Sequence, residues 1–326
     1  MQSPTKRLLL SSVLLLGGLA AVVLTHRSEA HQVWRSVGRL PLPYLAGALL
    51  LVLAQLGLQT LRLWAVIPWD AGVGLRRTAR AYMLGELTNL VIPARAGDAL
   101  KVALLTRGAE PRLGAPRAVG AVLADKVLDA GSLVLLCAAA GLLDVVRAGW
   151  PARLASLPLA LGGAAGVAVG LLAVRLARPR WYGRLTAVAR EVGRGLAALR
   201  SPTRLAAGLA LACSLGAWLA ELGALGVLCG SLGVSLSLPQ RVLALAILNV
   251  GISLPVSFAN IGVYEATLAL GLSRAGVPLA TTIAIATVHH AVELLAICLS
   301  AATTWLLVRS THSRALHTAR TSLTCG

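Results

Sequence analysis

The sequence has little charge and lacks the motifs of most soluble enzymes. Only 13% of its 326 residues are Asp, Glu, Lys or Arg, against about 25% in a typical soluble domain. It contains no P-loop, no dinucleotide-binding glycine pattern, no Cys-x-x-Cys pair and no Asp-x-Asp motif. The five cysteines are scattered, so no disulfide framework or metal site is indicated. We therefore expect no cofactor, no metal and no nucleotide-driven step.

Long hydrophobic runs dominate instead. The chain is 57% hydrophobic, with a mean hydropathy of +0.79. A helix that spans a bilayer needs about 20 mainly apolar residues. Six runs are candidates for such spans: Leu8–Leu24, Leu42–Leu63, Arg117–Leu143, Leu154–Val174, Leu205–Leu232 and Leu279–Val308. The sequence thus predicts an all-α polytopic membrane protein, with residues 1–326 forming a single integral membrane domain.

Basic residues are abundant, and their placement indicates a topology. The formal net charge is +18, and most of the basic residues fall in loops that we assign to the cytoplasm, as the positive-inside rule requires. Both termini are then cytoplasmic, and the charge attracts anionic lipid at that face rather than nucleic acid. The arginine-rich segment Arg178–Arg204 is either a helix lying on the cytoplasmic leaflet or a solvated linker.

Two further apolar segments, Leu75–Gly108 and Arg241–Arg274, are each interrupted by helix-breaking residues. The proposed hinges are Pro93 and Gly97 in the first and Pro255 and Gly262 in the second. Irregular backbone at membrane depth persists only where protein buries it or where it lines a watery cavity. Because their flanks are assigned to opposite sides, we expect two re-entrant broken-helix hairpins that open to opposite sides. A kinked helix is the alternative for each break.

The two hairpins belong to matching halves of the chain. Each precedes a span with polar residues one helical turn apart, Asp125 and Asp129 in the first and His289 and Glu293 in the second. Pro93 and Pro255 lie 162 residues apart, and both of those polar positions recur after 164 residues. Repeat one covers about 42–143, a linker span and the basic segment cover 154–204, and repeat two covers about 205–308. Inverted repeats with interrupted segments are typical of transporters.

Acidic residues are concentrated in these apolar segments. Seven of the twelve acids lie there, whereas the bases inside are Arg95, Lys101 and Lys126, with Arg62 assigned to a span end. Intramembrane carboxylates are candidate functional groups by default, and this excess requires protons, cations or water to offset it. We expect gating or proton-carrying roles for Asp98, Glu265, Asp125, Asp129, His289 and Glu293.

Three of these expectations have structural alternatives. Asp98 and Glu265 each fall in the first turn of a second hairpin arm, where a carboxylate also acts as a helix cap. Lys126 and Asp129 are three residues apart and are also suited to a structural ion pair.

Arg95 is the strongest candidate for contact with a substrate. It lies at a hairpin tip just before a helix start, and its guanidinium fork suits a phosphate. An internal bridge to Asp98 is the alternative. Neutral hydrogen-bonding groups surround the same loops and complete the predicted substrate site: Asn89, Ser253, Ser257 and Asn260.

These stretches also carry a family resemblance. NLVIPARAGDALK (89–101), AVLADKVLD (121–129) and SLPVSFANIGVYE (253–265), followed by a histidine-bearing last span, resemble the lysylphosphatidylglycerol synthase transmembrane region. That flippase-like membrane family occurs alone or fused to soluble transferase domains. Members generally have an arginine where this chain has Lys126. The resemblance implies a bacterial inner-membrane protein with the lipid-translocating half and without the synthase half, since the chain ends soon after its last predicted span.

The leading functional hypothesis is therefore movement of an amphipathic membrane lipid between leaflets, without enzymatic chemistry. We expect an anionic or polyprenyl-phosphate-type lipid as the substrate. Two alternatives remain open: a membrane-embedded glycosyl or lipid head-group transferase, and an accessory subunit that partners a lipid-modifying enzyme.

Overall fold

The described part of the chain is helical. The computed structural model describes residues 37–38, 40–92, 96–107, 113–148, 204–253 and 258–324, and no β-strand occurs in these ranges. Four helices are long and apolar enough to cross a membrane: α3 (Leu42–Val66), α6 (Ala115–Ala148), α9 (Arg204–Ser231) and α12 (Leu279–Thr324). They correspond to four of the six predicted spans. The predicted spans Leu8–Leu24 and Leu154–Val174 lie outside the described residues.

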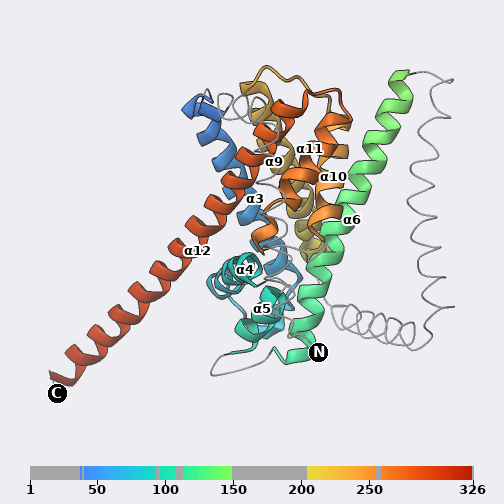
Figure 1. Cartoon of the computed structure of the whole chain (residues 1–326). Coiled ribbons are helices and arrows are strands. Elements are labelled where there is room, and N and C mark those ends of the chain that lie inside the picture. The colour runs from blue at the N-terminus through green and yellow to red at the C-terminus, as the bar shows by residue number, and fades with distance from the viewer. Residues whose placement is uncertain are drawn as a thin grey trace, which may run out of the picture.

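The helix boundaries agree with the sequence at three spans and differ at the fourth. Pro41 caps α3, with a proline-compatible extended backbone, and α9 begins and ends within one residue of the prediction. By contrast, α12 continues to Thr324, well beyond the apolar stretch Leu279–Leu306. Figure 1 shows this extension as a straight continuation of α12 away from the other helices.

Both interrupted segments form pairs of short helices. The first comprises α4 (Leu75–Val91) and α5 (Ala96–Thr106), and the second comprises α10 (Leu238–Ile252) and α11 (Val263–Ser273), with the short helix η3 (Phe258–Asn260) between them. In each pair the two arms pack against one another. Neither segment is therefore a continuous kinked helix, and that alternative is wrong for both. Pro93 and Pro255 themselves lie outside the described residues.

The two predicted glycine hinges have different structural roles. Gly262 has a φ of 85° and occupies the N-cap of α11, a conformation that disfavours any residue with a Cβ. Gly97, in contrast, lies inside the first turn of α5, after the break. A Cβ there would collide with the carbonyl oxygen of Gly85 on α4, so Gly97 serves close packing of the arms and is not the hinge that the sequence predicted.

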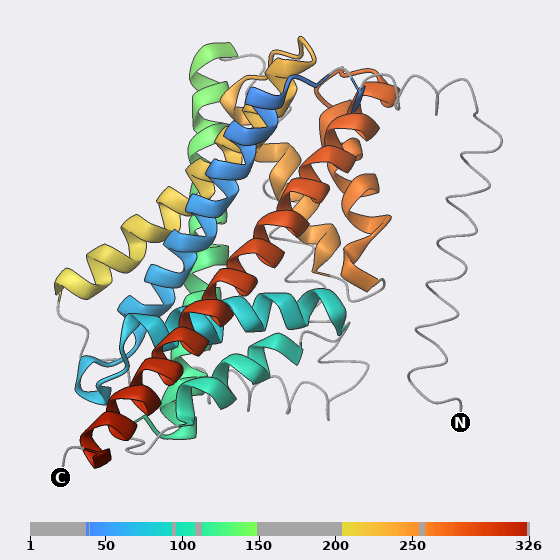
Figure 2. The ribbon, with the colours of Figure 1, turned by 90° about the vertical axis from the view of Figure 1, so that its left-hand side faces the viewer.

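The hairpins attach at opposite ends of the helix bundle. The chain enters and leaves the α4–α5 pair at the end of the bundle where α3 ends and α6 begins (Figure 1). It enters and leaves the α10–α11 pair at the other end, where α9 ends and α12 begins (Figures 1 and 2). Figure 2 also shows α4 and α5 crossing the long helices, and α4 contacts η3. The broken ends of the two hairpins thus meet inside the bundle.

This arrangement gives a direct test of topology. Arg107 follows the first hairpin and Arg274 ends the second, and both side chains are exposed. In a cysteine-free background, we expect Arg107→Cys to react with an impermeant thiol reagent only from the cytoplasm and Arg274→Cys only from outside. Labelling of both positions from one side would contradict the opposite orientation of the hairpins.

Candidate functional site

A polar cavity of about 560 Å³ lies where the two hairpins meet the four long helices. Its volume is in the range of small-molecule sites. Every described element except η1 (Trp69–Ala71) contributes to its lining. Six of the predicted site residues line it. Five carry a carboxylate or an amide, and the sixth carries a hydroxyl: Asn89, Asp98, Asp129, Asn260, Glu293 and Ser253. The sequence therefore predicted part of the polar lining.

The lining is rich in acids. Glu86, Asp98, Asp129, Glu221 and Glu293 all face the cavity, together with Lys126 and His290. How these charges are compensated divides the site into three parts: an arginine network, a lysine network and a corner formed by glutamine and glutamate.

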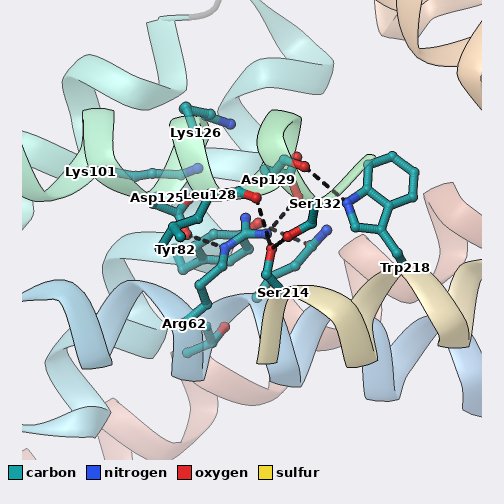
Figure 3. Close-up of polar contacts among 12 residues, drawn as sticks. Arg62, Tyr82, Lys101, Asp125, Lys126, Leu128, Asp129, Ser132, Ser214 and Trp218 are labelled. Carbon is teal, nitrogen blue, oxygen red and sulfur yellow. Dashed lines mark hydrogen bonds and ion pairs between the residues drawn. The ribbon is translucent and has the colours of Figure 1, made fainter. Parts of the chain in front are cut away.

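The arginine network joins α3, α6 and α9 (Figure 3). Arg62 is 1% exposed; its Nε lies 2.6 Å from Asp125 Oδ1 and its Nη1 lies 2.5 Å from Asp129 Oδ1. Nη1 also donates to Ser214 Oγ at 3.1 Å. Trp218 Nε1 donates to the backbone oxygen of Asp129 at 3.1 Å. A guanidinium with several well-placed donors is the group best suited to hold two carboxylates in a buried site.

Two sequence-based expectations are wrong at this network. Arg62 was assigned to a span end, yet α3 continues to Val66 and places the guanidinium inside the bundle. Lys126 was considered as the partner of Asp129, but its Nζ lies 3.6 Å from Asp98 Oδ1 instead. Lys126 and Asp129 lie on the same helix, α6, but each pairs with an opposite charge on a different helix: Lys126 with Asp98 on α5, and Asp129 with Arg62 on α3.

The lysine network holds the first hairpin together. Lys101 on α5 is fully buried, and its Nζ lies 2.5 Å from Glu86 Oε1 on α4 and 3.3 Å from Asp98 Oδ1. The same ammonium lies 4.3 Å from the centre of the Tyr82 ring, within cation–π distance. Asn89 Oδ1 accepts a hydrogen bond from the backbone N–H of Gly97 at 2.9 Å. Asn89 thus joins the arms and lines the cavity at once.

The second hairpin is held by a different set of contacts, made with α12. Glu265 Oε2 accepts from the Gly262 N–H at 2.7 Å, which is the capping alternative foreseen for this residue. Its Oε1 lies 2.7 Å from His290 Nδ1. Tyr264 hydroxyl lies 2.6 Å from His289 Nδ1, and its ring stacks on His290 at 4.2 Å. The histidine that faces the cavity is therefore His290, whereas the sequence pattern had favoured His289.

The remaining corner is formed by Gln55 on α3, Glu221 on α9 and Glu293 on α12. Gln55 Nε2 donates to Glu221 Oε2 at 3.1 Å. In the described residues, neither glutamate forms an ion pair. Tyr264 engages the Nδ1 atom of His289, whereas His289 Nε2 and Glu293 Oε1 have no hydrogen-bond partner among the described residues.

Some predicted site residues cannot be placed, and others were missed. Arg95 and Ser257 lie outside the described residues. Glu86 and Glu221 were counted among the seven intramembrane acids but were given no specific role. No site role was predicted for three more polar residues within apolar segments, namely Gln55, Arg62 and Lys101. A polar residue within an apolar segment was the sequence signal that could have identified them. Among the described residues, no group of three or more His, Cys, Asp or Glu side chains is arranged to hold a metal ion.

The comparisons with known proteins agree with the resemblance found in the sequence. A family model described as "Lysylphosphatidylglycerol synthase TM region" matches residues 8–310. No curated protein and no solved structure matches the chain. The family match covers nearly the entire chain, including both hairpins and all four described spans. The chain therefore belongs to the family of the lysylphosphatidylglycerol synthase transmembrane region.

Proposed function

We propose that this protein moves an amphipathic lipid between the leaflets of a bacterial inner membrane. The observation that carries the proposal is the polar cavity of about 560 Å³ at the meeting point of two broken-helix hairpins. A polar cavity among membrane-spanning helices offers a lipid head group hydrogen bonds that the hydrocarbon core cannot supply. The acyl chains would remain in the surrounding bilayer while the head group crosses.

The hairpins support a transport mechanism over a passive binding role. They attach at opposite ends of the bundle, and each contributes a polar side chain near its break to the same cavity, Asn89 from α4 and Asn260 from η3. We propose that they form an inverted repeat, with both termini cytoplasmic, in which each hairpin closes the cavity toward one side. Alternating access would then be an exchange between a state in which the cavity opens to one side of the membrane and a state in which it opens to the other.

The charge of the lining constrains the head group. The cavity presents five carboxylates and one lysine. A phosphate held by Arg95 remains our prediction for the anionic part of the lipid. Glu221 and Glu293, which form no ion pair among the described residues, additionally require a positive charge, and the head group, a bound cation or a proton would supply it.

Blocking the cavity tests the proposal. Ala130 lines the cavity from α6, whereas Ala139 is another exposed alanine on the same helix that does not line it. We expect Ala130→Trp to reduce the movement of fluorescent phospholipid analogues in proteoliposomes at least about tenfold, because an indole is large enough to occupy much of such a site. Ala139→Trp should retain the wild-type rate.

The outcomes separate transport from the alternatives. Equal rates for both variants, or a wild-type rate no faster than that of protein-free liposomes, would contradict lipid movement through this cavity. Lipid that binds to the purified protein without moving would favour the accessory-subunit hypothesis. A chemically altered head group in the recovered lipid would favour the transferase hypothesis.

A further inference from the structure

Three polar side chains from three different spans line the cavity, and they form the part of it that is called the corner here. Gln55, Glu221 and Glu293 all line it, and they come from α3, α9 and α12. Gln55 is 6% exposed and Glu221 is 8% exposed, so both are buried despite facing the cavity. The hydrogen bond from Gln55 Nε2 to Glu221 Oε2 fixes which end of the amide points toward that carboxylate.

Two oxygen atoms in this corner have no hydrogen-bond partner among the described residues. They are Gln55 Oε1 and Glu293 Oε1, and both atoms are buried. A buried acceptor without a donor destabilises the folded protein, and a charged one does so more strongly. Both atoms are acceptors, so what the corner lacks is a donor or a positive charge.

The other acids of the cavity differ because each lies beside a base, although Asp98 Oδ1 also has no hydrogen-bond partner among the described residues. Asp129 is held by Arg62, Glu86 by Lys101, and Asp98 by Lys101 and Lys126. For Glu221, the charged neighbours that act on it are two acids, Glu293 and Asp129. Two carboxylates that share a buried site cannot both be ionised without a large cost.

The remaining titratable and charged groups on the packed elements have other contacts. Tyr82 donates to Gln59, Tyr264 lies against His289, and His290 lies against Glu265. Arg241 on α10 approaches α9 but donates to the backbone oxygen of Leu222 at 3.3 Å. The Nε2 atom of His289 is buried and has no hydrogen-bond partner. In the described part of the chain, no ion pair neutralises Glu221 or Glu293.

We propose that Glu221 and Glu293 hold one exchangeable proton between them, so that this corner is a proton site of the transporter. A protonated carboxyl removes one negative charge and supplies an O–H donor to a corner that contains only unmet acceptors. A divalent metal ion would require more ligands than these residues provide. The additional inference that the proton accompanies the lipid rests on the proposed function.

Proton binding is measurable without any transport assay. Infrared spectra of the purified full-length protein in lipid nanodiscs should show the C=O stretch of a protonated carboxyl, with a shift in D2O and loss as the pH is raised. Glu221→Gln and Glu293→Gln should each abolish that titrating band. Asp70→Asn is the matched control, since Asp70 is an exposed acid outside the cavity, paired with Arg117. It should leave the band unchanged.

Other outcomes would overturn the proposal. A wild-type protein with no titrating carboxyl band would do so, and so would a band that survives both glutamine variants. A band that appears only in Arg95→Gln would identify Arg95 as the missing partner. Loss of the band on addition of Na⁺ at constant pH would assign the corner to a metal cation. Where a glutamine variant does not accumulate, Glu221→Asp and Glu293→Asp should shift the band in place of abolishing it.

A second measurement tests the coupling. An imposed pH gradient should accelerate lipid movement by the wild type, and Glu293→Gln should lose that response. Protonation without any lipid movement would contradict the proposed function while leaving the proton site intact. Lipid movement without a titrating band would contradict the proton site alone.

Discussion

Replacing Arg62 with methionine is expected to destabilise the protein strongly. Methionine fills a similar volume but leaves Asp125 and Asp129 without their guanidinium, and Asp125 is 1% exposed. Breaking a buried ion pair by removing one partner costs about 3–5 kcal/mol, because the remaining charge stays buried and uncompensated. Thermal unfolding of the purified protein in detergent should show a markedly lower midpoint.

Arg117 provides the matched control. It also pairs with an aspartate, Asp70, but these side chains are 40% and 63% exposed. An exposed pair contributes about 0–1 kcal/mol, so Arg117→Met should shift the midpoint little. Adding Asp125→Asn and Asp129→Asn to Arg62→Met should recover part of the loss, because the amides carry no charge to leave unpaired. Equal midpoints for the Arg62 and Arg117 variants would show that the buried network does not stabilise the fold.

The hairpins were predictable because their signal is local. Proline in a helix interior interrupts the helix, and the glycines and polar residues around Pro93 and Pro255 lie within one segment of sequence. The breaks after Ile92 and Ile252 follow from those residues without knowledge of the rest of the chain. The packing role of Gly97 depends on a contact that is not local in sequence, because Gly85 lies on the facing arm of the hairpin.

The pairing of charges was not predictable for the same reason. Lys126 and Asp129 are close in sequence, yet Arg62 reaches Asp129 across 67 residues and Gln55 reaches Glu221 across 166. Which charge meets which depends on how α3 packs against α6 and α9. Composition alone revealed an excess of buried acids, but only the packing shows that this excess collects at Glu221 and Glu293.

The acids of the cavity therefore have different capacities to respond to a substrate. Glu86 and Asp98 are tied to lysines that hold the first hairpin, and Asp129 is tied to an arginine that joins three spans. Protonation of any of these would break a structural ion pair. Glu221 and Glu293 have no such partner in the described chain, so a change in their charge leaves the ion pairs of the scaffold in place.

Gly97→Ala is expected to disrupt the first hairpin itself. The new Cβ would meet the carbonyl oxygen of Gly85, which is backbone and cannot rotate away, and it would lie 2.5 Å from Asn89 Oδ1. Overpacking costs typically 1–3 kcal/mol and occasionally more, and we expect about 3 kcal/mol here because α4 and α5 must separate. Their separation would also weaken the hydrogen bond from Gly97 to Asn89 and the ion pair between Lys101 and Glu86.

Gly131→Ala tests whether this effect comes from the close contact or from the loss of a helical glycine. Gly131 lies within α6, and no neighbouring atom lies within 4 Å of the position that a Cβ would occupy, so the added methyl group meets open space. In a helix interior, alanine is more favourable than glycine by about 1 kcal/mol. Gly131→Ala should therefore leave the unfolding midpoint unchanged or raise it. Gly97→Ala should lower the midpoint by many degrees and slow lipid movement as well. Similar midpoints for the two variants would mean that α4 and α5 do not pack as closely as Gly85 and Gly97 indicate.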